Sequence, residues 1–346
     1  MSTNRQTPTE FFRDRTILVT GGAGSVGRHL VKRLLSLKPS SIRVLDNNET
    51  GLFNLEHELK SPVIRTLVGD VRDGGRLNMA MYDVDIVFHA AALKHVPLCE
   101  FNPFDAVKTN VLGTQNLIEA AIANDVAQVI NISTDKAVIP TNVMGATKLL
   151  GERLISSAAH YTGRRRTIFS SVRFGNVLNT RGSVIPLFQS QIRNGGPVTV
   201  TDPAMTRFFM EISQAVDLIL RTTLLAKGRE LFILKMPALR LGDLAECMVE
   251  IFAPKYGFIP EKIRMEIIGR RSGEKLHEDL MTEDEAPFAY ESRDMFVIIP
   301  PVYYPEAYRP RVPSGFRKSR LARFSSQDAN LISRDTILEM LGKIEE

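Results

Sequence analysis

The sequence predicts an α/β fold, in which a doubly wound parallel sheet with helices on both faces is accompanied by a smaller C-terminal domain. Short β-rich runs alternate with helical stretches along the first half of the chain, and this alternation stops after about Phe174, where turn signals and prolines follow. The 346 residues suffice for one large domain and a smaller partner. We expect the sheet in residues 1–175, with about 211–237 returning to it. Residues 176–346 are expected to form mainly the smaller domain and a basic tail.

The elements are expected in a regular order. Near-continuous apolar runs are typical of strands that are buried on both faces. Such runs predict strands at 16–20, 42–45, 63–68, 85–89, 128–133 and 167–172. Helical patterns predict helices at 27–37, 103–124, 145–160 and 213–224.

Composition restricts the class of protein. Hydrophobic residues make up 44% and charged residues 24%, which is an ordinary globular balance. No run of 18 apolar residues occurs, so no membrane-spanning helix is expected, and the polar N-terminus lacks the apolar core of a secretory signal. The two cysteines, Cys99 and Cys247, have no metal-type spacing. We therefore expect a cytoplasmic protein without a metal site.

The net charge of +5 raises the question of nucleic acid. Basic residues cluster at Arg164–Arg166 and again between Arg309 and Arg323. No recognisable nucleic-acid-binding module or aromatic stacking pattern accompanies them. A basic surface also attracts metabolites that carry a diphosphate, and we expect such a partner rather than nucleic acid.

A glycine-rich turn follows the first predicted strand. Gly21, Gly24 and Gly27 stand in GxxGxxG spacing, and the turn, with Ser25 and Val26, opens the next helix. Glycine lets the backbone turn sharply and lets a pyrophosphate approach the N–H groups at the helix start. The sequence therefore predicts a Rossmann-type fold that binds a dinucleotide.

The second predicted strand ends at Asp46, 19 residues after Gly27. A carboxylate at this place accepts hydrogen bonds from the adenosine ribose and repels a 2′-phosphate. Asn47 follows in place of the arginine that NADP enzymes usually supply, although Arg43 within the strand is a weak counter-argument. NAD is therefore favoured as cofactor over NADP.

Seven spaced motifs extend the pattern: TGGAGSVGRHL, GDVRD (69–73), HAAALKHVP (89–97), STDKAVIPTNVMGATK (133–148), RFGNVLNTRGSVIPLF (173–188), DPAMTRFFM (202–210) and RSGEKLHE (271–278). In this order they resemble the polysaccharide-biosynthesis branch of the extended short-chain dehydrogenase/reductases, the UDP-N-acetylglucosamine 4,6-dehydratases. The resemblance covers roughly residues 13–280 and is far more specific than a glycine-rich turn alone.

The resemblance implies roles for further residues. Asp70 and Val71 would lie beside the adenine, whereas Ala90, Ala91, Lys94 and Asn110 would line or support the cofactor site, and Lys148 would contact the nicotinamide ribose. The nucleotide sugar would be held by Lys94, His95, Asn176, Arg181, Ser183, Arg207, Arg271 and Glu274. Arginines and a carboxylate suit a diphosphate and a ribose.

The expected chemistry centres on the run Thr134-Asp135-Lys136. A 4,6-dehydratase oxidises C4 of the sugar, removes the C5 proton while the C6 hydroxyl leaves, and then reduces C6 through the same bound cofactor. Asp135 is the candidate acid and Lys136 the candidate base, as the resemblance also implies. Asp135 must then be protonated and Lys136 neutral in part of the cycle.

Met144 departs from the usual pattern. Short-chain dehydrogenases typically place Tyr-x-x-x-Lys on a helix, and here Met144 precedes Lys148 at that spacing. A thioether cannot take the proton of the C4 hydroxyl, so Thr134, Lys148 or a bound water is a candidate. By resemblance, this points to methionine-type dehydratases, with or without C5 epimerisation, rather than to the tyrosine-type enzymes that invert C5.

The leading hypothesis is therefore a hydro-lyase that converts UDP-N-acetylglucosamine, or a close UDP-sugar, to the 4-keto-6-deoxy sugar for glycan biosynthesis. A C4- or C5-epimerase is the first alternative, and a non-catalytic NAD-binding sensor is the second. By resemblance, helices 103–124 and 145–160 pack against a second copy, which implies a homodimer or a larger homo-oligomer.

Overall fold

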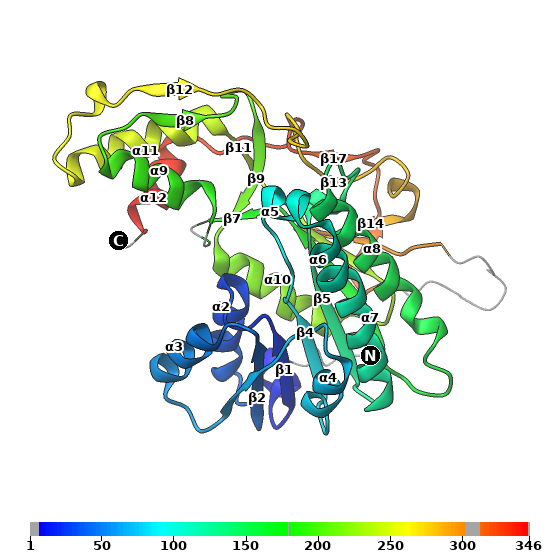
Figure 1. Ribbon diagram of the computed structural model, residues 1–346. Helices are drawn as coiled ribbons and strands as arrows, with labels where there is room; N and C mark the ends of the chain where they lie inside the picture. Colours follow the sequence, from blue (N-terminus) through cyan, green and yellow to red (C-terminus); the bar gives the residue numbers. More distant parts are fainter. Residues whose placement is uncertain (1–6, 179, 181, 302–311, 345–346) are drawn as a thin grey trace.

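The computed structural model describes residues 7–178, 180, 182–301 and 312–344. Within these residues, ten strands form one sheet in the order β16-β14-β15-β10-β6-β5-β4-β1-β2-β3 (Figure 1). The strands from β10 to β3 are parallel, and β15, β14 and β16 continue the sheet in antiparallel pairs. Their bounds are β1 Thr16–Thr20, β2 Ser41–Asp46, β3 Ile64–Val68, β4 Ile86–His89, β5 Gln128–Thr134, β6 Ile168–Phe174, β10 Leu231–Leu234, β14 Ala289–Glu291, β15 Met295–Ile298 and β16 Arg317–Lys318.

The sequence predictions for the parallel strands agree with β1 to β6 to within two residues. Side chains alternate between the two faces of a strand, and in β1 this sends Ile17 and Val19 into one apolar core and Leu18 into another. Both cores are closed by helices, so each strand needs apolar residues on both faces. The predicted α/β fold with a doubly wound sheet is confirmed.

Helices cover both faces of the sheet (Figure 1). One face is covered by α2 (Ser25–Leu35) and α10 (Ile212–Leu225), with α1 (Pro8–Phe12) against α10. The other face carries α4 (Gly74–Ala80), α7 (Gly113–Ala123) and α8 (Val143–Ser157). Among the helices that the sequence analysis did not predict are α3 (Glu49–Leu59), α4 and α5 (Val96–Phe101). The last two have only seven and six residues, which is too short for a clear helical period.

The helix predicted at 103–124 has three parts: α6 (Pro103–Val107), a π-helical turn (η1, Lys108–Leu112) and α7. The π-helical turn contains Asn110, and such turns are frequent at functional sites. Helix α8 begins two residues earlier than predicted, because the Asn142 side chain accepts a hydrogen bond from the Gly145 N–H and caps it.

A second, smaller core lies beyond the carboxyl ends of the parallel strands (Figure 1). It is formed by α9 (Val184–Arg193), α11 (Leu241–Lys255) and α12 (Arg334–Gly342) with short strands. Strand β9 (Thr206–Met210) pairs with β7 (Asn176–Val177) on one side and with β11 (Ala238–Arg240) on the other, and β8 (Val198–Val200) pairs with β12 (Met265–Ile267). A further pair joins β13 (Asp279–Met281) to β17 (Phe324–Ser325).

The segment expected to return to the first domain, about 211–237, forms α10 and β10, and β10 pairs with β6 in the main sheet. The main sheet also takes up β14, β15 and β16 from the part of the chain expected to be mainly substrate-binding. The functional division of the chain near residue 175 stays a prediction.

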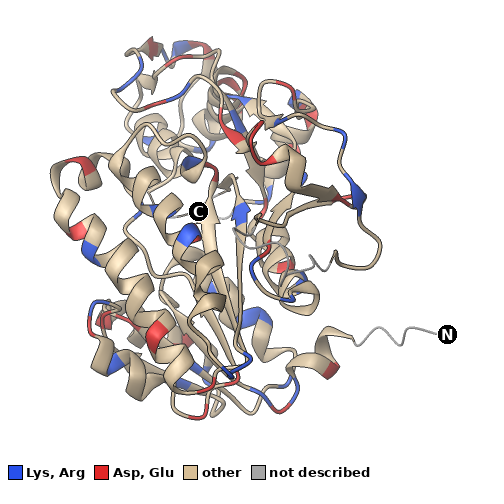
Figure 2. Cartoon of the chain, turned by 90° about the vertical axis from the view of Figure 1, so that its right-hand side faces the viewer, with Lys and Arg blue, Asp and Glu red and all other residues tan. Residues whose placement is uncertain are grey.

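Charged residues of both signs are interspersed over most of the elements (Figure 2). In the described part of the chain, no helix is long and apolar enough to cross a membrane. The same residues contain no group of three or more His, Cys, Asp or Glu side chains that could hold a metal ion. Cys99 and Cys247 are buried free thiols.

Candidate active site

The glycine turn between β1 and α2 leaves no room for side chains. Gly21 has a φ of +68°, and a Cβ added there would lie 2.5 Å from the Ala91 backbone nitrogen. At Gly27 an added Cβ would lie 2.3 Å from the Gly21 carbonyl oxygen. Gly24 is the residue before α2 and makes no side-chain cap, so the first turn, which includes Ser25 and Val26, presents its backbone N–H groups at a helix N-terminus, where anions are favoured. These residues fit the pyrophosphate of a dinucleotide.

The residues expected around the adenosine lie together at the ends of β2 and β3. Asp46 accepts hydrogen bonds from the Ala23 N–H (3.0 Å) and the Asn48 N–H (2.9 Å), which fixes its carboxylate beside the glycine turn. Asn47 donates to Asp70 (3.3 Å). The hydrogen bond from Arg72 keeps the pKa of Asp70 below its usual value.

Arg43, the counter-argument for NADP, donates to the Ala80 carbonyl oxygen (2.9 Å). Its guanidinium is therefore held away from the Asp46 carboxylate by α4. Val71 lies in the core and is 3% exposed; a Cβ added to Gly113 would lie 2.8 Å from its side chain.

Asn110 fixes the loop after β4 that carries Ala90, Ala91 and Lys94. Its side chain accepts a hydrogen bond from the Leu93 N–H (2.9 Å) and donates to the Leu93 carbonyl oxygen (3.0 Å) and to Thr147 Oγ1 (3.0 Å). The loop is thereby joined to α8. These hydrogen bonds fit the supporting role that the family resemblance implied for Asn110, and that role stays a prediction.

Asp135 and Lys136 form a buried ion pair at the end of β5. Asp135 is 0% exposed, and its Oδ1 accepts hydrogen bonds from Thr134 Oγ1 (2.8 Å) and Lys136 Nζ (2.9 Å). Lys136 also donates to Asn176 Oδ1 (3.2 Å). Burial lowers the pKa of the Lys136 ammonium, but attraction to Asp135 and Glu278 outweighs it, so this pKa is raised. Asp135 Oδ2 is buried and has no hydrogen-bond partner among the described residues.

Met144 and Lys148 lie on the same helix with different surroundings. Met144 is 3% exposed and packs in a small apolar cluster with Cys99 and Ala106. Lys148 donates to the Ile132 carbonyl oxygen (2.7 Å), and burial lowers its pKa to about 8.

Arg207 stands among the candidate substrate residues and is largely buried. Its guanidinium donates to the carbonyl oxygens of Lys275 (2.9 Å) and Leu276 (3.1 Å), so it holds the segment after residue 270 against β9. Arg271 and Glu274 belong to the loop before this segment, where Glu274 accepts a hydrogen bond from the Arg271 N–H (3.1 Å). This loop is docked on the start of α8, since Thr141 Oγ1 donates to the Gly273 carbonyl oxygen (2.7 Å).

His95 and Ser183 come together at the start of α9. The ring of His95 lies against Gly182, where an added Cβ would be 2.3 Å from the ring. Ser183 is the residue before α9, and its buried Oγ has no hydrogen-bond partner among the described residues. Arg181 lies outside the described residues.

Glu278 is a residue of this site that the sequence analysis quoted in a motif but gave no role. It is 5% exposed, and its carboxylate oxygens lie 3.9 Å from Arg207 Nε and 3.9 Å from Lys275 Nζ. Burial raises its pKa, and so does the nearby charge of Asp135. The signal in the sequence was the last glutamate of the RSGEKLHE motif, but the sequence alone did not show that its side chain is buried.

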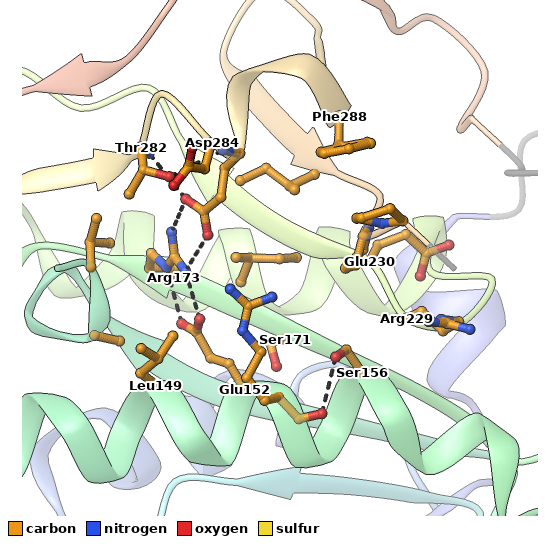
Figure 3. A pocket seen from close by; sticks show the side chains of 18 of the residues that line it. Leu149, Glu152, Ser156, Ser171, Arg173, Arg229, Glu230, Thr282, Asp284 and Phe288 are labelled. Carbon is orange, nitrogen blue, oxygen red and sulfur yellow. Dashed lines mark hydrogen bonds and ion pairs between the residues drawn. The ribbon is translucent and has the colours of Figure 1, made fainter. Parts of the chain in front are cut away.

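Arg173 on β6 forms a second buried charge cluster with Glu152 on α8 (Figure 3). Its guanidinium donates to both carboxylate oxygens of Glu152 (3.0 and 2.6 Å) and of Glu285 (2.9 and 2.9 Å), and to the Leu280 carbonyl oxygen. The cluster borders a cavity of about 340 Å³, which Ala137 and Val138 also line. The helix that carries Lys148 is thus held to the segment 280–285.

A parallel sheet with a glycine turn, a carboxylate at the end of β2 and a lysine on α8 defines a short-chain dehydrogenase/reductase of the extended type. The chain belongs to the family described as polysaccharide biosynthesis proteins, whose model matches residues 17–300. This confirms the family that the seven motifs indicated.

Curated relatives carry several names. The chain is 56% identical to an "uncharacterized membrane protein", MJ1061, of Methanocaldococcus jannaschii, over 97% of this chain and 98% of that one. It is 39% identical, over 85% of both chains, to a UDP-N-acetylglucosamine 4,6-dehydratase (inverting) of Campylobacter jejuni. It is also 43% identical to a UDP-glucose 4-epimerase of Rickettsia bellii, over 79% of this chain and 80% of that one.

Two solved structures share the fold. The structure of Pen from Bacillus thuringiensis is 44% identical, covers 96% of this chain and 98% of its own, and superposes with a TM-score of 0.89. DesIV of Streptomyces venezuelae, a dTDP-glucose 4,6-dehydratase solved with NAD, is 25% identical, with a TM-score of 0.67 over 75% of this chain and 86% of its own. The protein is therefore similar to nucleotide-sugar dehydratases and epimerases that use a nicotinamide cofactor.

Proposed function

We propose that the protein is a nucleotide-sugar 4,6-dehydratase that converts UDP-N-acetylglucosamine, or a close UDP-sugar, to its 4-keto-6-deoxy product with bound NAD. The observation that carries this proposal is the buried Asp135–Lys136 pair at the end of β5, where the family places its acid and base. NAD is chosen over NADP because the Asp46 carboxylate lies beside the glycine turn. The Campylobacter relative supports the choice of sugar.

The cofactor site and the acid–base pair have different roles in the proposed reaction. When bound, NAD supplies reversible oxidation of the sugar at C4 and reduction at C6. The glycine turn, Asp46 and Lys148 hold and orient it. Lys136 removes the C5 proton, and Asp135 gives a proton to the departing C6 hydroxyl, so one proton enters and one leaves the pair while water is formed.

The pair must first rearrange its protons. Lys136 can act as a base only when its amine is neutral, and Asp135 can act as an acid only when its carboxyl is protonated. One proton that moves from Lys136 Nζ to Asp135 across their 2.9 Å hydrogen bond gives both forms at once. Burial favours this uncharged pair over two charges.

Lys148 is our candidate for the base that replaces the missing tyrosine at C4. Its pKa of about 8 makes a part of the amines neutral near pH 8. The Thr134 hydroxyl is a weaker candidate because it already donates to Asp135. Met144 is assigned to packing and not to proton transfer, since it is buried with Cys99 and Ala106.

The first experiment incubates the purified protein with UDP-N-acetylglucosamine in heavy water and determines the mass of the product. A dehydratase gives loss of water together with one deuterium at C5. A product that keeps its 6-hydroxyl contradicts the proposal. Unchanged substrate with NAD still bound would favour another nucleotide sugar, and after that a non-catalytic role.

A second candidate function, epimerisation of a UDP-sugar, is favoured by the Rickettsia relative named UDP-glucose 4-epimerase. A C4-epimerase gives a product with the same mass as its substrate and takes no deuterium from heavy water at C5. The same experiment therefore separates the two functions.

A further inference from the structure

Glu278 is held in place by its backbone. Its N–H donates to Ser326 Oγ (2.9 Å), and its carbonyl oxygen accepts from the Ser326 N–H (2.8 Å). The side chain is nevertheless 5% exposed, directly before β13, which contacts the turn that carries Asp135 and Lys136. A change of the carboxylate to an amide therefore leaves these backbone hydrogen bonds in place.

Five charged groups share this region. Glu278 faces Arg207 on β9 and Lys275 on its own segment, each 3.9 Å away, and Asp135 and Lys136 on the turn after β5. Both distances exceed hydrogen-bond length, and Glu278 Oε2 has no hydrogen-bond partner in the part of the chain that the structure describes. The carboxylate therefore acts on its neighbours through its charge.

That charge has opposite effects on the two catalytic groups. It attracts the Lys136 ammonium and so contributes to the raised pKa of this lysine. Asp135 and Glu278 repel each other, and this repulsion raises the pKa of Glu278. Burial keeps solvent from screening these interactions.

We propose that Glu278 is a positioning residue of the acid–base pair: its buried carboxylate is the second counter-charge of Lys136 and a like-charged neighbour of Asp135, and it sets the pH range in which the pair works. The consequence for catalysis rests on the proposed function, whereas the consequence for Lys136 does not. Removal of the charge makes Lys136 lose its proton more readily. The limb of the pH profile that reports Lys136 then moves to lower pH.

The first test needs no substrate. Full-length protein with NAD is treated with acetic anhydride at a series of pH values, and acetylation of Lys136, whose side chain is 27% exposed, is followed by peptide mass spectrometry. Only the neutral amine reacts. Glu278→Gln is expected to lower the pH of half-maximal reactivity by about one unit or more, because Lys136 loses a nearby opposite charge. An unchanged midpoint overturns the proposal.

Two further variants make the result specific. Glu283→Gln removes the same charge from an exposed position a few residues further along and is expected to leave the midpoint unchanged. Glu278→Asp keeps the charge and is expected to return the midpoint toward that of the wild type. A shift in Glu283→Gln, or an aspartate variant no higher than the glutamine variant, contradicts the proposal.

The second test is the pH profile of kcat with UDP-N-acetylglucosamine. Glu278→Gln is expected to shift the limb that reports Lys136 to lower pH, whereas a merely structural defect lowers kcat without a shift. A profile that does not move overturns the proposal. If the wild-type protein forms no product while the Lys136 midpoint shifts as expected, the proposed function fails and the assignment of Glu278 stands.

Discussion

Asp135 is completely buried, and one of its carboxylate oxygens has no hydrogen-bond partner among the described residues. This arrangement is energetically unfavourable for an ionised group. Its other oxygen is shared by Thr134 and Lys136. These surroundings support the proposed role of Asp135 as the acid, which the motif also indicates.

Asp135→Asn tests this role directly. The amide has no proton of suitable acidity to give, so loss of water from the sugar is expected to fall by about 10²–10⁴-fold. Lys136 loses its nearest counter-charge and stays able to accept a proton, so deuterium from heavy water is still expected to enter at C5. Mass spectrometry of substrate and product measures both. Asp284→Asn, on an exposed residue, serves as control; water loss within tenfold of the wild-type rate would contradict the acid role.

The site residues that could be predicted from the sequence are those whose relative positions depend on a short stretch of chain. Gly21, Gly24 and Gly27 stand in a short turn, and Asp46 stands at a fixed spacing after it, so their association needs no long-range information. Glu278 meets Lys136 only because β13 reaches the turn after β5, 142 positions earlier in the chain (278 − 136). The spacing of Glu278 and Lys136 in the sequence does not show that they come close together.

At the scale of elements, His89 joins two strands and a helix. Its ring bonds to Thr20 Oγ1 in β1 (2.8 Å) and to Thr114 Oγ1 in α7 (3.2 Å). Burial, with a smaller effect of the Lys148 charge, lowers its pKa to about 3. The ring is therefore neutral in the folded protein at neutral pH.

This link predicts a loss of stability in acid. The unfolded chain takes up the His89 proton near pH 6.5 and the folded protein only near pH 3, so the contribution is complete above pH 6.5 and is lost as the pH falls between these values. Urea unfolding of wild type and His89→Gln should show the stability difference falling by about 1.4 kcal/mol per pH unit in this window. A difference that does not depend on pH would contradict the assignment.

The Arg173 cluster links α8 to the segment 280–285 (Figure 3). Arg173→Met leaves Glu152 and Glu285 as buried carboxylates without their cation, and we expect a loss of about 3–5 kcal/mol in the free energy of unfolding. Urea unfolding measures it. The triple variant Arg173→Met, Glu152→Gln, Glu285→Gln is expected to regain most of this loss. A single variant within 1 kcal/mol of wild type, by the same estimate, would show that the carboxylates find other partners.

Element positions were predicted well where apolar runs are long and poorly where elements are short. The strands β1 to β6 were placed to within two residues, because burial on both faces leaves a clear signal. The short strands β14 and β16 join the edge of the sheet, where β14 pairs with β15 and β16 pairs with β14, far from most of the parallel strands in sequence. No local sequence pattern predicts such a pairing.

At the scale of the whole molecule, an apolar surface runs over three helices that contact one another. Leu98 and Phe101 on α5, Phe104 on α6 and Leu150 on α8 are 61%, 83%, 79% and 47% exposed. Side chains of this size and number on adjoining helices mark an interaction surface. They support the proposal, first made from resemblance, that the protein forms a homodimer through these helices.

Phe104→Glu is expected to shift the dimer to a monomer, because a charge in the middle of an apolar interface must be desolvated without a partner. Light scattering coupled to size-exclusion chromatography gives the mass of the particle. Phe53→Glu, an equally drastic change at an exposed phenylalanine of α3, should leave the mass unchanged. A wild-type monomer, or a dimer that persists in the Phe104 variant, would contradict this interface.

The Arg173 cluster also depends on the order in which the chain is synthesised. Glu152 and Arg173 leave the ribosome early, whereas Glu285 is added 112 residues after Arg173. During that interval the nascent chain already contains the glycine turn, Asp135 and Lys136, while Arg173 has one of its two carboxylates. The ion pair between Arg173 and Glu285, which joins α8 to the segment 280–285, can therefore form only when the C-terminal part of the chain has emerged.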